Sequence, residues 1–434
     1  MRFVSTRGES PAVSLSEAIA AGLAPDGGLF VPTSMPSIDV SAFDGKTSLG
    51  DIASTLLAPF FDGDVLASEL DAICGEAFTF DAPLRPLATP DDFVLELFHG
   101  PTAAFKDFGA RFLAACMRRL PRRDVRPTTV IVATSGDTGA AVAAAFHRVD
   151  GFRVVILYPD GRVSPRQAHQ LGCFGDNVRA FRVGGSFDDC QRMVKHALSD
   201  SELQADVPMT SANSISLGRL LPQMIFYAQA ALSHWRHKST LLNFVVPTGN
   251  LGNALACMFA RVIGLPIGQI ALATNANRTL RDFFAGSNYR PRASIATHAN
   301  AMDVGAPSNF ERLRWLFPDA AQLRQAFTID AVGDAAIDAT IRVRYESFGE
   351  IFCPHTAAAV HTLERLRRDG ATGDWAIVST AHPAKFERIV EPLIGRNVPI
   401  PATLAALLVR PSSSEILAAR DDALASVLRD ESLG

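Results

Sequence analysis

This sequence contains little lysine, no closely spaced pair of cysteines and no long apolar run. Every apolar run is shorter than the ~18 residues that a membrane span needs, and Glu9 and Glu17 interrupt any signal-peptide core near the N-terminus. The six cysteines include no C-x-x-C spacing, which indicates reduced thiols in a cytosolic protein. We therefore expect a cytoplasmic protein without disulfides, and we assign no metal ligands.

The charge balance argues against two classes of partner. The 434 residues carry 41 Lys and Arg against 45 Asp and Glu, a formal net charge of -4. A mildly acidic protein is a poor match for nucleic acid or for an anionic membrane surface. The contents of 48% hydrophobic and 20% charged residues are typical of a globular protein, here with two or three domains.

Lysine is the scarce member of the basic residues. Of the 41, 36 are arginines and only five are lysines, namely Lys46, Lys106, Lys195, Lys238 and Lys385. Only lysine among them offers an amine that can bond covalently to a carbonyl group. Any such chemistry in this protein therefore has a short list of candidates.

The first 80 residues differ in pattern from the rest. They are rich in Pro, Gly and Asp, with helix-like stretches at residues 14–22 and 50–60, which indicates a small, mostly helical N-terminal domain. Residues 81–434 then form a catalytic region, in which we expect a smaller lobe at roughly residues 105–225 and a larger lobe from the remainder.

Beyond residue 80, short apolar runs alternate with longer Ala- and Leu-rich stretches. We predict strands at residues 92–97, 128–133, 152–158, 178–183, 242–246, 268–273 and 374–379. We predict helices at residues 107–119, 138–149, 164–171, 187–199, 216–232, 252–263, 278–285, 333–347, 355–368 and 383–394. Continuous apolar strands alternating with helices indicate an α/β fold with mostly parallel sheets flanked by helices.

Two of the predicted strand-to-helix junctions are rich in glycine. In α/β sheets, ligands bind where the carboxyl ends of strands meet helices. The first junction, TSGDTG at residues 134–139, sets hydroxyl groups and backbone N–H groups at a helix start, where an anion can bind. Ordinary capping explains one such polar residue, but four polar residues interleaved with two glycines favour a ligand site.

The second junction is TGNLGN at residues 248–253. Backbone N–H groups in such a turn bind phosphate without a charged side chain. The pattern is neither the G-x-G-x-x-G of dinucleotide sites nor a P-loop, which indicates a small, single phosphate. The structural alternative is a tight contact between helix and strand.

A third junction, TAHPAKF at residues 380–386, places Thr380 at the end of a predicted strand and Lys385 in the following helix. Lys106 lies between Phe105 and Phe108, before an amphipathic helix. Aromatic neighbours desolvate an amine, which lowers its pKa and favours the neutral nucleophile of a Schiff base. A surface role for Lys106 is the alternative, and Lys385 is the rival lysine.

Together these features suggest pyridoxal 5'-phosphate (PLP) as cofactor. PLP needs an amine for its aldehyde, N–H groups for its phosphate and a partner for its ring nitrogen. Lys106, residues 249–253 and Thr380 supply these groups in that order. A hydroxyl group opposite the ring nitrogen leaves it unprotonated, which favours elimination and replacement over transamination.

The sequence resembles the threonine synthase family, in the bacterial and fungal branch with an extra N-terminal segment. The matching stretches are GLFVP (28–32), LELFHGPTAAFKDFGARF (95–112), ATSGDTGAAV (133–142), VVILYPDG (154–161), SANSIS (211–216), VPTGNLGNALA (246–256), NAMDV (300–304) and TAHPAKF (380–386). The resemblance implies the two-lobed PLP fold of the tryptophan synthase β type. It implies conversion of O-phospho-L-homoserine and water to L-threonine and phosphate through a PLP aldimine on Lys106.

The resemblance also implies roles for individual residues. Lys106 is the catalytic lysine. The cofactor is held by Lys106, Asp137, Gly249, Asn250, Leu251, Gly252, Asn253 and Thr380, with Asp137 near the ring hydroxyl where this fold usually places an Asn. The substrate is held by Ser135, Thr138, Asn213, Ser214 and Arg219. For Arg219 the alternative is an ordinary surface ion pair.

Two other functions stay open. One is a PLP-dependent serine or threonine dehydratase, which has no need of a site for a leaving phosphate. The other is a non-catalytic relative that binds phosphorylated ligands, against which the intact Lys106 and both glycine-rich loops argue. We expect a small-molecule substrate and a monomer or homodimer. His355 is expected to cap the helix that follows it, and Lys385 has no assigned role.

Overall fold

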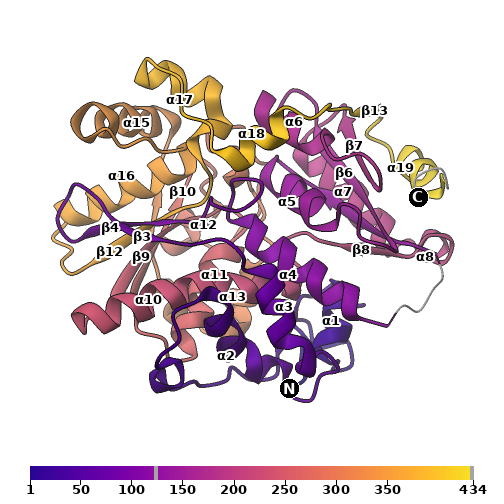
Figure 1. The fold of residues 1–434 in the computed structure, drawn as a ribbon, viewed down its shortest axis with the longest axis horizontal. Helices are drawn as coiled ribbons and strands as arrows, with labels where there is room; N and C mark the ends of the chain where they lie inside the picture. Colours follow the sequence, from indigo (N-terminus) through magenta and orange to yellow (C-terminus); the bar gives the residue numbers. More distant parts are fainter. Residues whose placement is uncertain (122–125, 431–434) are drawn as a thin grey trace.

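The computed structural model describes residues 1–121 and 126–430 as two α/β lobes and a smaller N-terminal unit. In Figure 1 the larger lobe lies on the left, the smaller lobe on the right, and helices α1 to α3 lie below them. The lobes are built on two separate sheets.

The N-terminal unit combines three helices with a two-stranded antiparallel sheet. Ser14 and Glu17 form a capping box at the start of its first helix, which satisfies free N–H groups there. Its elements are β1 (Phe3–Ser5), α1 (Leu15–Ala21), β2 (Phe30–Pro32), η1 (Val40–Phe43), α2 (Leu49–Phe61), η2 (Ala67–Glu69) and α3 (Leu70–Ala77).

The larger lobe is built on a six-stranded sheet with the order β11-β10-β9-β12-β4-β3. Its pairings are parallel, except that the edge strand β3 runs antiparallel to β4. The strands are β3 (Leu84–Pro86), β4 (Asp92–Glu96), β9 (Leu242–Pro247), β10 (Ile267–Thr274), β11 (Thr328–Ala331) and β12 (Trp375–Ser379).

The smaller lobe is built on a five-stranded parallel sheet with the order β13-β7-β6-β5-β8. Every residue of β6 is buried, as expected for a strand covered by helices on both faces. The strands are β5 (Thr128–Ala133), β6 (Phe152–Pro159), β7 (Val178–Val183), β8 (Met209–Ser211) and β13 (Glu415–Leu417).

Helices cover both sheets (Figure 1). In the smaller lobe and the passage to the larger one they are α4 (Lys106–Arg119), α5 (Asp137–Phe146), α6 (Pro165–Gly172), α7 (Phe187–Ser199), α8 (Ser201–Asp206), α9 (Leu217–Leu220) and η3 (Leu221–Gln223). The remainder are α10 (Met224–Lys238), α11 (Gly252–Val262), α12 (Thr279–Phe284), η4 (Asn300–Met302), α13 (Phe310–Leu316), α14 (Ala320–Gln325), α15 (Asp334–Phe348), α16 (Pro354–Arg368), η5 (Pro383–Phe386), α17 (Glu387–Ile394), α18 (Ala402–Leu408) and α19 (Asp421–Arg429).

The predicted fold class is confirmed, and each predicted strand is present with its limits shifted by at most one or two residues. Two predicted helices are wrong in their continuity, and one of them, 383–394, divides into η5 and α17. The stretch 216–232 divides into α9, η3 and α10, because Pro222 has no N–H to donate to a preceding turn. No helix within the described residues is both long enough and apolar enough to cross a membrane.

We keep the N-terminal domain at residues 1–80 and the two-lobed region at residues 81–434 as a proposal. Strand pairing supports one addition to the smaller lobe. The segment Glu415–Leu417 pairs with β7, so the C-terminal part of the chain returns to the smaller sheet instead of staying with the larger lobe.

One hydrophobic core joins the N-terminal unit to both lobes. It contains buried residues of α2 and α3, of α4 and α5, and of α10 and α11. At its centre the ring of Phe108 lies 6.3 Å from that of Phe78, 4.6 Å from that of Phe80 and 5.3 Å from that of Phe226. The N-terminal unit therefore shares its core with the helix that begins at Lys106.

Replacing Phe108 with alanine should weaken this shared core. We expect Phe108→Ala to lower the free energy of unfolding by about 3–5 kcal/mol, because it removes a fully buried ring and leaves a cavity. Urea unfolding followed by circular dichroism measures the change. Val409→Ala, at an exposed site, is the control and should change it by less than ~0.5 kcal/mol. A Phe108→Ala effect of the same small size would contradict the shared core.

Candidate active site

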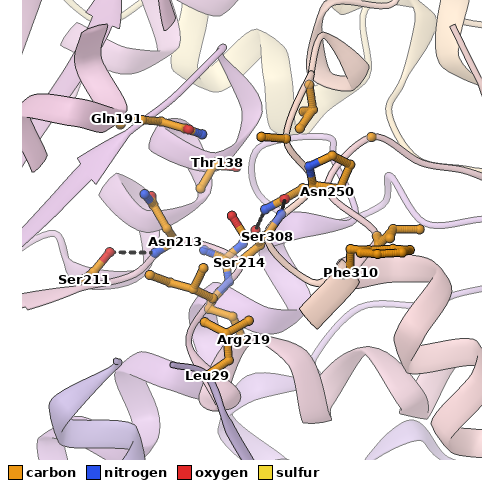
Figure 2. A pocket seen from close by; sticks show the side chains of 18 of the residues that line it. Leu29, Thr138, Gln191, Ser211, Asn213, Ser214, Arg219, Asn250, Ser308 and Phe310 are labelled. Carbon is orange, nitrogen blue, oxygen red and sulfur yellow. Dashed lines mark hydrogen bonds between the residues drawn. The ribbon is translucent and has the colours of Figure 1, made fainter. Parts of the chain in front are cut away.

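A cavity of about 1130 Å³ lies between the two lobes and the N-terminal unit. Its walls come from the loops that follow β5, β8, β9 and β12, together with α7 and residues of the 21–29 loop. It lies at the carboxyl ends of the strands, as ligand sites in parallel sheets do. Every cofactor and substrate residue assigned from the sequence lines this cavity; Figure 2 shows part of it.

Lys106 is the first residue of α4 and reaches into the cavity. The turn before it is held by Asp107, which accepts hydrogen bonds from the N–H (2.9 Å) and the hydroxyl (2.7 Å) of Thr102. The Phe105 N–H donates to the carbonyl of Thr380 (2.8 Å), so the start of α4 is tied to the end of β12. Burial lowers the pKa of Lys106 to about 8, with Asp137 opposing the shift. The amine is therefore partly neutral near pH 7.

The loop 248–253 joins β9 to α11 and faces the same cavity. Leu251 has a left-handed backbone (φ 64°), which turns successive N–H groups toward one side. Among residues 1–121 and 126–430 no acceptor is found for the backbone N–H groups of 249–252. This is a site for an anion at a helix N-terminus.

Gly249 has no space for a side chain. A Cβ atom built there would lie 2.7 Å from the Cα of Met302, which belongs to the backbone of η4. The close approach explains why glycine is needed at this position of the loop.

A hydrogen-bond network supports the loop from behind. The Asn250 side chain donates to Ser214 Oγ (2.6 Å) and accepts from the Ser308 N–H, as Figure 2 shows. Asn309 donates to the carbonyls of Asn250 (3.1 Å) and Ser214 (3.3 Å). The buried Arg312 then donates to Asn309 Oδ1 (2.8 Å) and to the Phe30 carbonyl (3.0 Å), so β2 of the N-terminal unit supports the loop.

A second group of polar side chains lies around Arg219. Its side chain is 2% exposed, and its Nε has no hydrogen-bond partner among the described residues. One terminal nitrogen donates to the Ala212 carbonyl, and no carboxylate of the described part of the chain forms an ion pair with it. The surface ion pair considered for Arg219 is therefore wrong. Burial lowers its pKa to about 10, which leaves it charged at pH 7.

Other unsatisfied polar atoms accompany Arg219. Asn213 Oδ1 and Asn253 Nδ2 are buried and have no partner among the described residues. Buried polar atoms are normally hydrogen-bonded, so unpaired ones beside a cavity indicate a bound group. Ser135 and Thr138, which follow β5, also line the cavity, and the Thr134 hydroxyl beside them accepts from the N–H groups of Gly136 (3.0 Å) and Gly139 (2.9 Å).

The two lysines that the sequence left as rivals differ in their surroundings. Lys106 lines the cavity, whereas Lys385 is fully enclosed behind Asp137 and is not part of the cavity wall. Lys385 Nζ lies 2.8 Å from Asp137 Oδ1 and donates to the Thr102 carbonyl (2.7 Å). Burial raises the pKa of Asp137, but the charges of Lys385 and Lys106 outweigh it and bring the pKa to about 2.

His355 does not cap α16, contrary to expectation. The N-cap is Cys353, without a side-chain cap, and the His355 ring faces the cavity. Its Nε2 accepts a hydrogen bond from the Ala301 N–H (3.1 Å), which requires a ring nitrogen without a proton. Burial lowers the pKa of His355 to about 4, so the ring is neutral at pH 7.

Sequence reasoning missed several other residues of the wall. Residues 300–304 had no assigned role in the sequence, and they line the cavity. Within them, Asn300 donates a hydrogen bond to the Ser135 carbonyl (3.3 Å). Arg7 of the N-terminal unit and Lys195 of α7 also line the cavity. The NAMDV motif, which matches the family, could have indicated that residues 300–304 belong to the site. Lys195 stands in a polar stretch of sequence, which gave no sign that it borders a cavity.

The site fits PLP on several independent observations. It offers an amine at Lys106, free N–H groups at residues 249–252, a hydroxyl group at Thr380 and buried polar atoms without partners. The strands and helices that bear these groups belong to two lobes, each built on its own sheet. The fold and site together define a PLP-dependent enzyme.

Comparisons with known proteins identify the family within this class. The family described as "Pyridoxal-phosphate dependent enzyme" matches residues 89–383, "Threonine synthase N terminus" matches residues 2–78, and "Threonine synthase, C-terminal" matches residues 356–427. Threonine synthase from Serratia marcescens is 37% identical over 421 residues, which cover 96% of this chain and 97% of that protein. The chain belongs to the threonine synthase family.

Solved structures agree with this assignment. The crystal structure of threonine synthase from Escherichia coli has a TM-score of 0.91 and 36% identity, covering 99% of each chain. The PLP-bound threonine synthase from Brucella melitensis has a TM-score of 0.88 and 35% identity, also covering 99% of each chain. The family, fold and cofactor predicted from the sequence are therefore confirmed.

Enlarging Gly249 tests the role of the loop. We expect Gly249→Ala to weaken PLP binding roughly 100-fold, because its Cβ would displace either the loop or the backbone at Met302. Equilibrium dialysis with PLP measures the affinity, and circular dichroism reports folding. Gly75→Ala on α3, where the new Cβ meets nothing within 4 Å, is the matched control and should bind PLP normally. Unchanged binding by Gly249→Ala would separate the loop from the cofactor.

Proposed function

We propose that this protein converts O-phospho-L-homoserine and water to L-threonine and inorganic phosphate, the threonine synthase reaction. One observation carries the proposal: the cavity beside Lys106 contains two separate places for an anion. One is the N–H group cluster at residues 249–252, and the other is Arg219, which lines the cavity and forms no ion pair among the described residues. A phosphorylated cofactor occupies one of them and a phosphorylated substrate the other.

Four groups hold the cofactor in this proposal. The Lys106 amine takes its aldehyde, the loop 249–253 holds its phosphate, Thr380 faces its ring nitrogen and Asp137 lies near its ring hydroxyl. PLP, when bound, withdraws electrons from the carbon that bears the substrate amine. The hydroxyl group of Thr380, unlike a carboxylate, leaves the ring nitrogen unprotonated, which suits elimination followed by addition of water.

Lys106 then moves protons. An amine with a pKa of about 8 is partly neutral at neutral pH, so it can accept the proton from Cα of the bound amino acid. The same ammonium can return a proton at neighbouring carbons, because the side chain begins at the fixed first turn of α4 and reaches along the cavity.

The substrate is oriented by its two acidic groups. Arg219, Asn213 and Ser214 hold the phosphate, for which a buried guanidinium group is well suited. Ser135 and Thr138, beside the N-terminus of α5, hold the carboxylate. Because Ser214 also accepts from Asn250, the phosphate of the substrate and that of the cofactor are held by one connected framework.

The other functions considered lack support. A serine or threonine dehydratase has no need of the second anion site around Arg219. A non-catalytic role leaves the lowered pKa of Lys106 without use. Free, buried cysteines support a cytoplasmic location. A monomer or a homodimer stays our expectation.

Removing the Lys106 amine tests the assignment. We expect purified Lys106→Ala to lose the visible absorbance of bound PLP and all threonine formation from O-phosphohomoserine, because the other lysine that the described residues place on the cavity wall, Lys195, lies on α7 and not at the strand ends. Absorbance spectra and assays of phosphate and threonine release measure both. Lys46→Ala, in the N-terminal unit, is the control and should keep both. If Lys106→Ala kept both, Lys106 would not be the lysine that binds the cofactor.

Arg219 tests recognition of the substrate phosphate. We expect Arg219→Ala to reduce kcat/KM for O-phosphohomoserine roughly 10- to 100-fold, because a charge-assisted contact to phosphate is lost. Inhibition by L-homoserine, which has no phosphate, should change little. Arg420→Ala, at an exposed site, is the control. Equal weakening of both ligands would show that Arg219 only supports the fold.

A further inference from the structure

Lys385 is the second lysine in the interior of the site, and the reaction as described does not use it. Its side chain is 0% exposed, and it lies behind Asp137 as seen from the cavity. Its ammonium group contacts Asp137 Oδ1 (2.8 Å) and the Thr102 carbonyl (2.7 Å). It therefore joins the loop before Lys106 to the first residue of α5.

The backbone around Lys385 is held from both lobes. The Ser164 hydroxyl donates to the Lys385 carbonyl (2.6 Å), and Arg166 donates to the Ala384 carbonyl (2.6 Å). The His382 ring accepts from the Ala384 N–H (3.2 Å) and caps η5. These contacts fix the backbone from which the Lys385 side chain reaches Asp137, and Lys385 is not among the residues that line the cavity.

Asp137 is held by the same arrangement. Gln167 Nε2 donates to Asp137 Oδ1 (3.0 Å), the oxygen that also contacts Lys385. A buried carboxylate needs partners that offset the cost of its desolvation. Gln167 and Lys385 supply them from α6 and η5, so the carboxylate presents one orientation to the cavity.

The charge of Asp137 matters because Lys106 is close to it. The groups that act on Lys106 are Asp137 from α5, Arg219 from α9 and Lys385 from η5, and the neutral His355 faces it from α16. Asp107, next in the chain, acts on Lys385. An uncompensated Asp137 carboxylate would stabilise the protonated form of Lys106, whereas the pair of Asp137 and Lys385 carries no net charge.

We propose that Lys385 is a positioning residue, which orients and neutralises Asp137 so that the Lys106 amine stays available in its neutral form. The inference rests on the proposed function, because it takes Lys106 as the amine that receives PLP. In this role Lys385 acts through Asp137 and does not contact the cofactor or the substrate.

The electrostatic directions agree with this geometry. Burial lowers the pKa of Lys106, Asp137 raises it, and Arg219 and Lys385 lower it further, to about 8. Removing the charge of Lys385 should therefore raise the pH at which the Lys106 amine becomes neutral. Removing the charge of Asp137 should lower that pH, and removing both should restore it.

The experiment measures this pH directly in the full chain. Protein stripped of PLP is mixed with PLP at a series of pH values, and the rate of covalent capture is followed by visible absorbance. Because only the neutral amine reacts, the rate rises with pH and its midpoint reports the pKa of Lys106. The wild type should show a midpoint near pH 8.

Three variants form a cycle. We expect Lys385→Met to move the midpoint up by about one pH unit and Asp137→Asn to move it down by about as much. The double variant should return to within about half a unit of the wild type. Lys238→Met breaks a similar pair, with Asp374 at 2.6 Å, and should leave the midpoint unchanged.

The outcomes separate this inference from the proposed function. If the wild type captures no PLP, the proposed function is wrong. If it captures PLP but Lys385→Met keeps the wild-type midpoint, only the role of Lys385 is overturned, even where yield or rate falls. Should Lys385→Met not fold, the double variant compared with Asp137→Asn still tests the charge, and equal midpoints there would overturn the proposal.

Discussion

The parallel pairing of β12 with β4 on one side and β9 on the other is the constraint on which the site depends. Parallel strands end at the same edge, so the loops that follow them meet there. Thr380 after β12, the turn that leads from β4 to Lys106, and the loop 248–253 after β9 thus face one cavity. The hydrogen bond from the Phe105 N–H to Thr380 joins two of these loops directly.

Burial of charged side chains determines the chemistry of the residues around this cavity. Asp137, Lys385 and Arg219 are buried, Lys106 lies beside them on the cavity wall, and a buried charge is costly without a partner. Asp137 and Lys385 satisfy each other, whereas Arg219 keeps a free Nε and Lys106 a lowered pKa. The two groups left unsatisfied are those that we propose to act on substrate, and the paired ones hold them in place.

The N-terminal unit is part of the site as well as of the fold. It shares a hydrophobic core with α4, and Arg312 connects β2 to the framework behind the loop 248–253. Residues of the 21–29 loop also line the cavity. These contacts give a physical role to a segment whose sequence carries no recognisable chemistry: it supports both the lysine helix and the phosphate loop.

Local patterns in the sequence determined the alternation of strands and helices and the glycine-rich junctions, including residues 249–253. They reduced the five lysines to Lys106 and Lys385, and the family resemblance then chose Lys106. Apolar periodicity, turn chemistry and aromatic neighbours act over a few residues, so they can be read along the chain. Only the tertiary structure decided that Lys385 pairs with Asp137, that His355 accepts from Ala301, that Arg219 is buried, and that the three-residue strands β8 and β13 exist. Each of these depends on a partner far away in sequence, and the distance through space between two such groups is set by the packing of the whole chain.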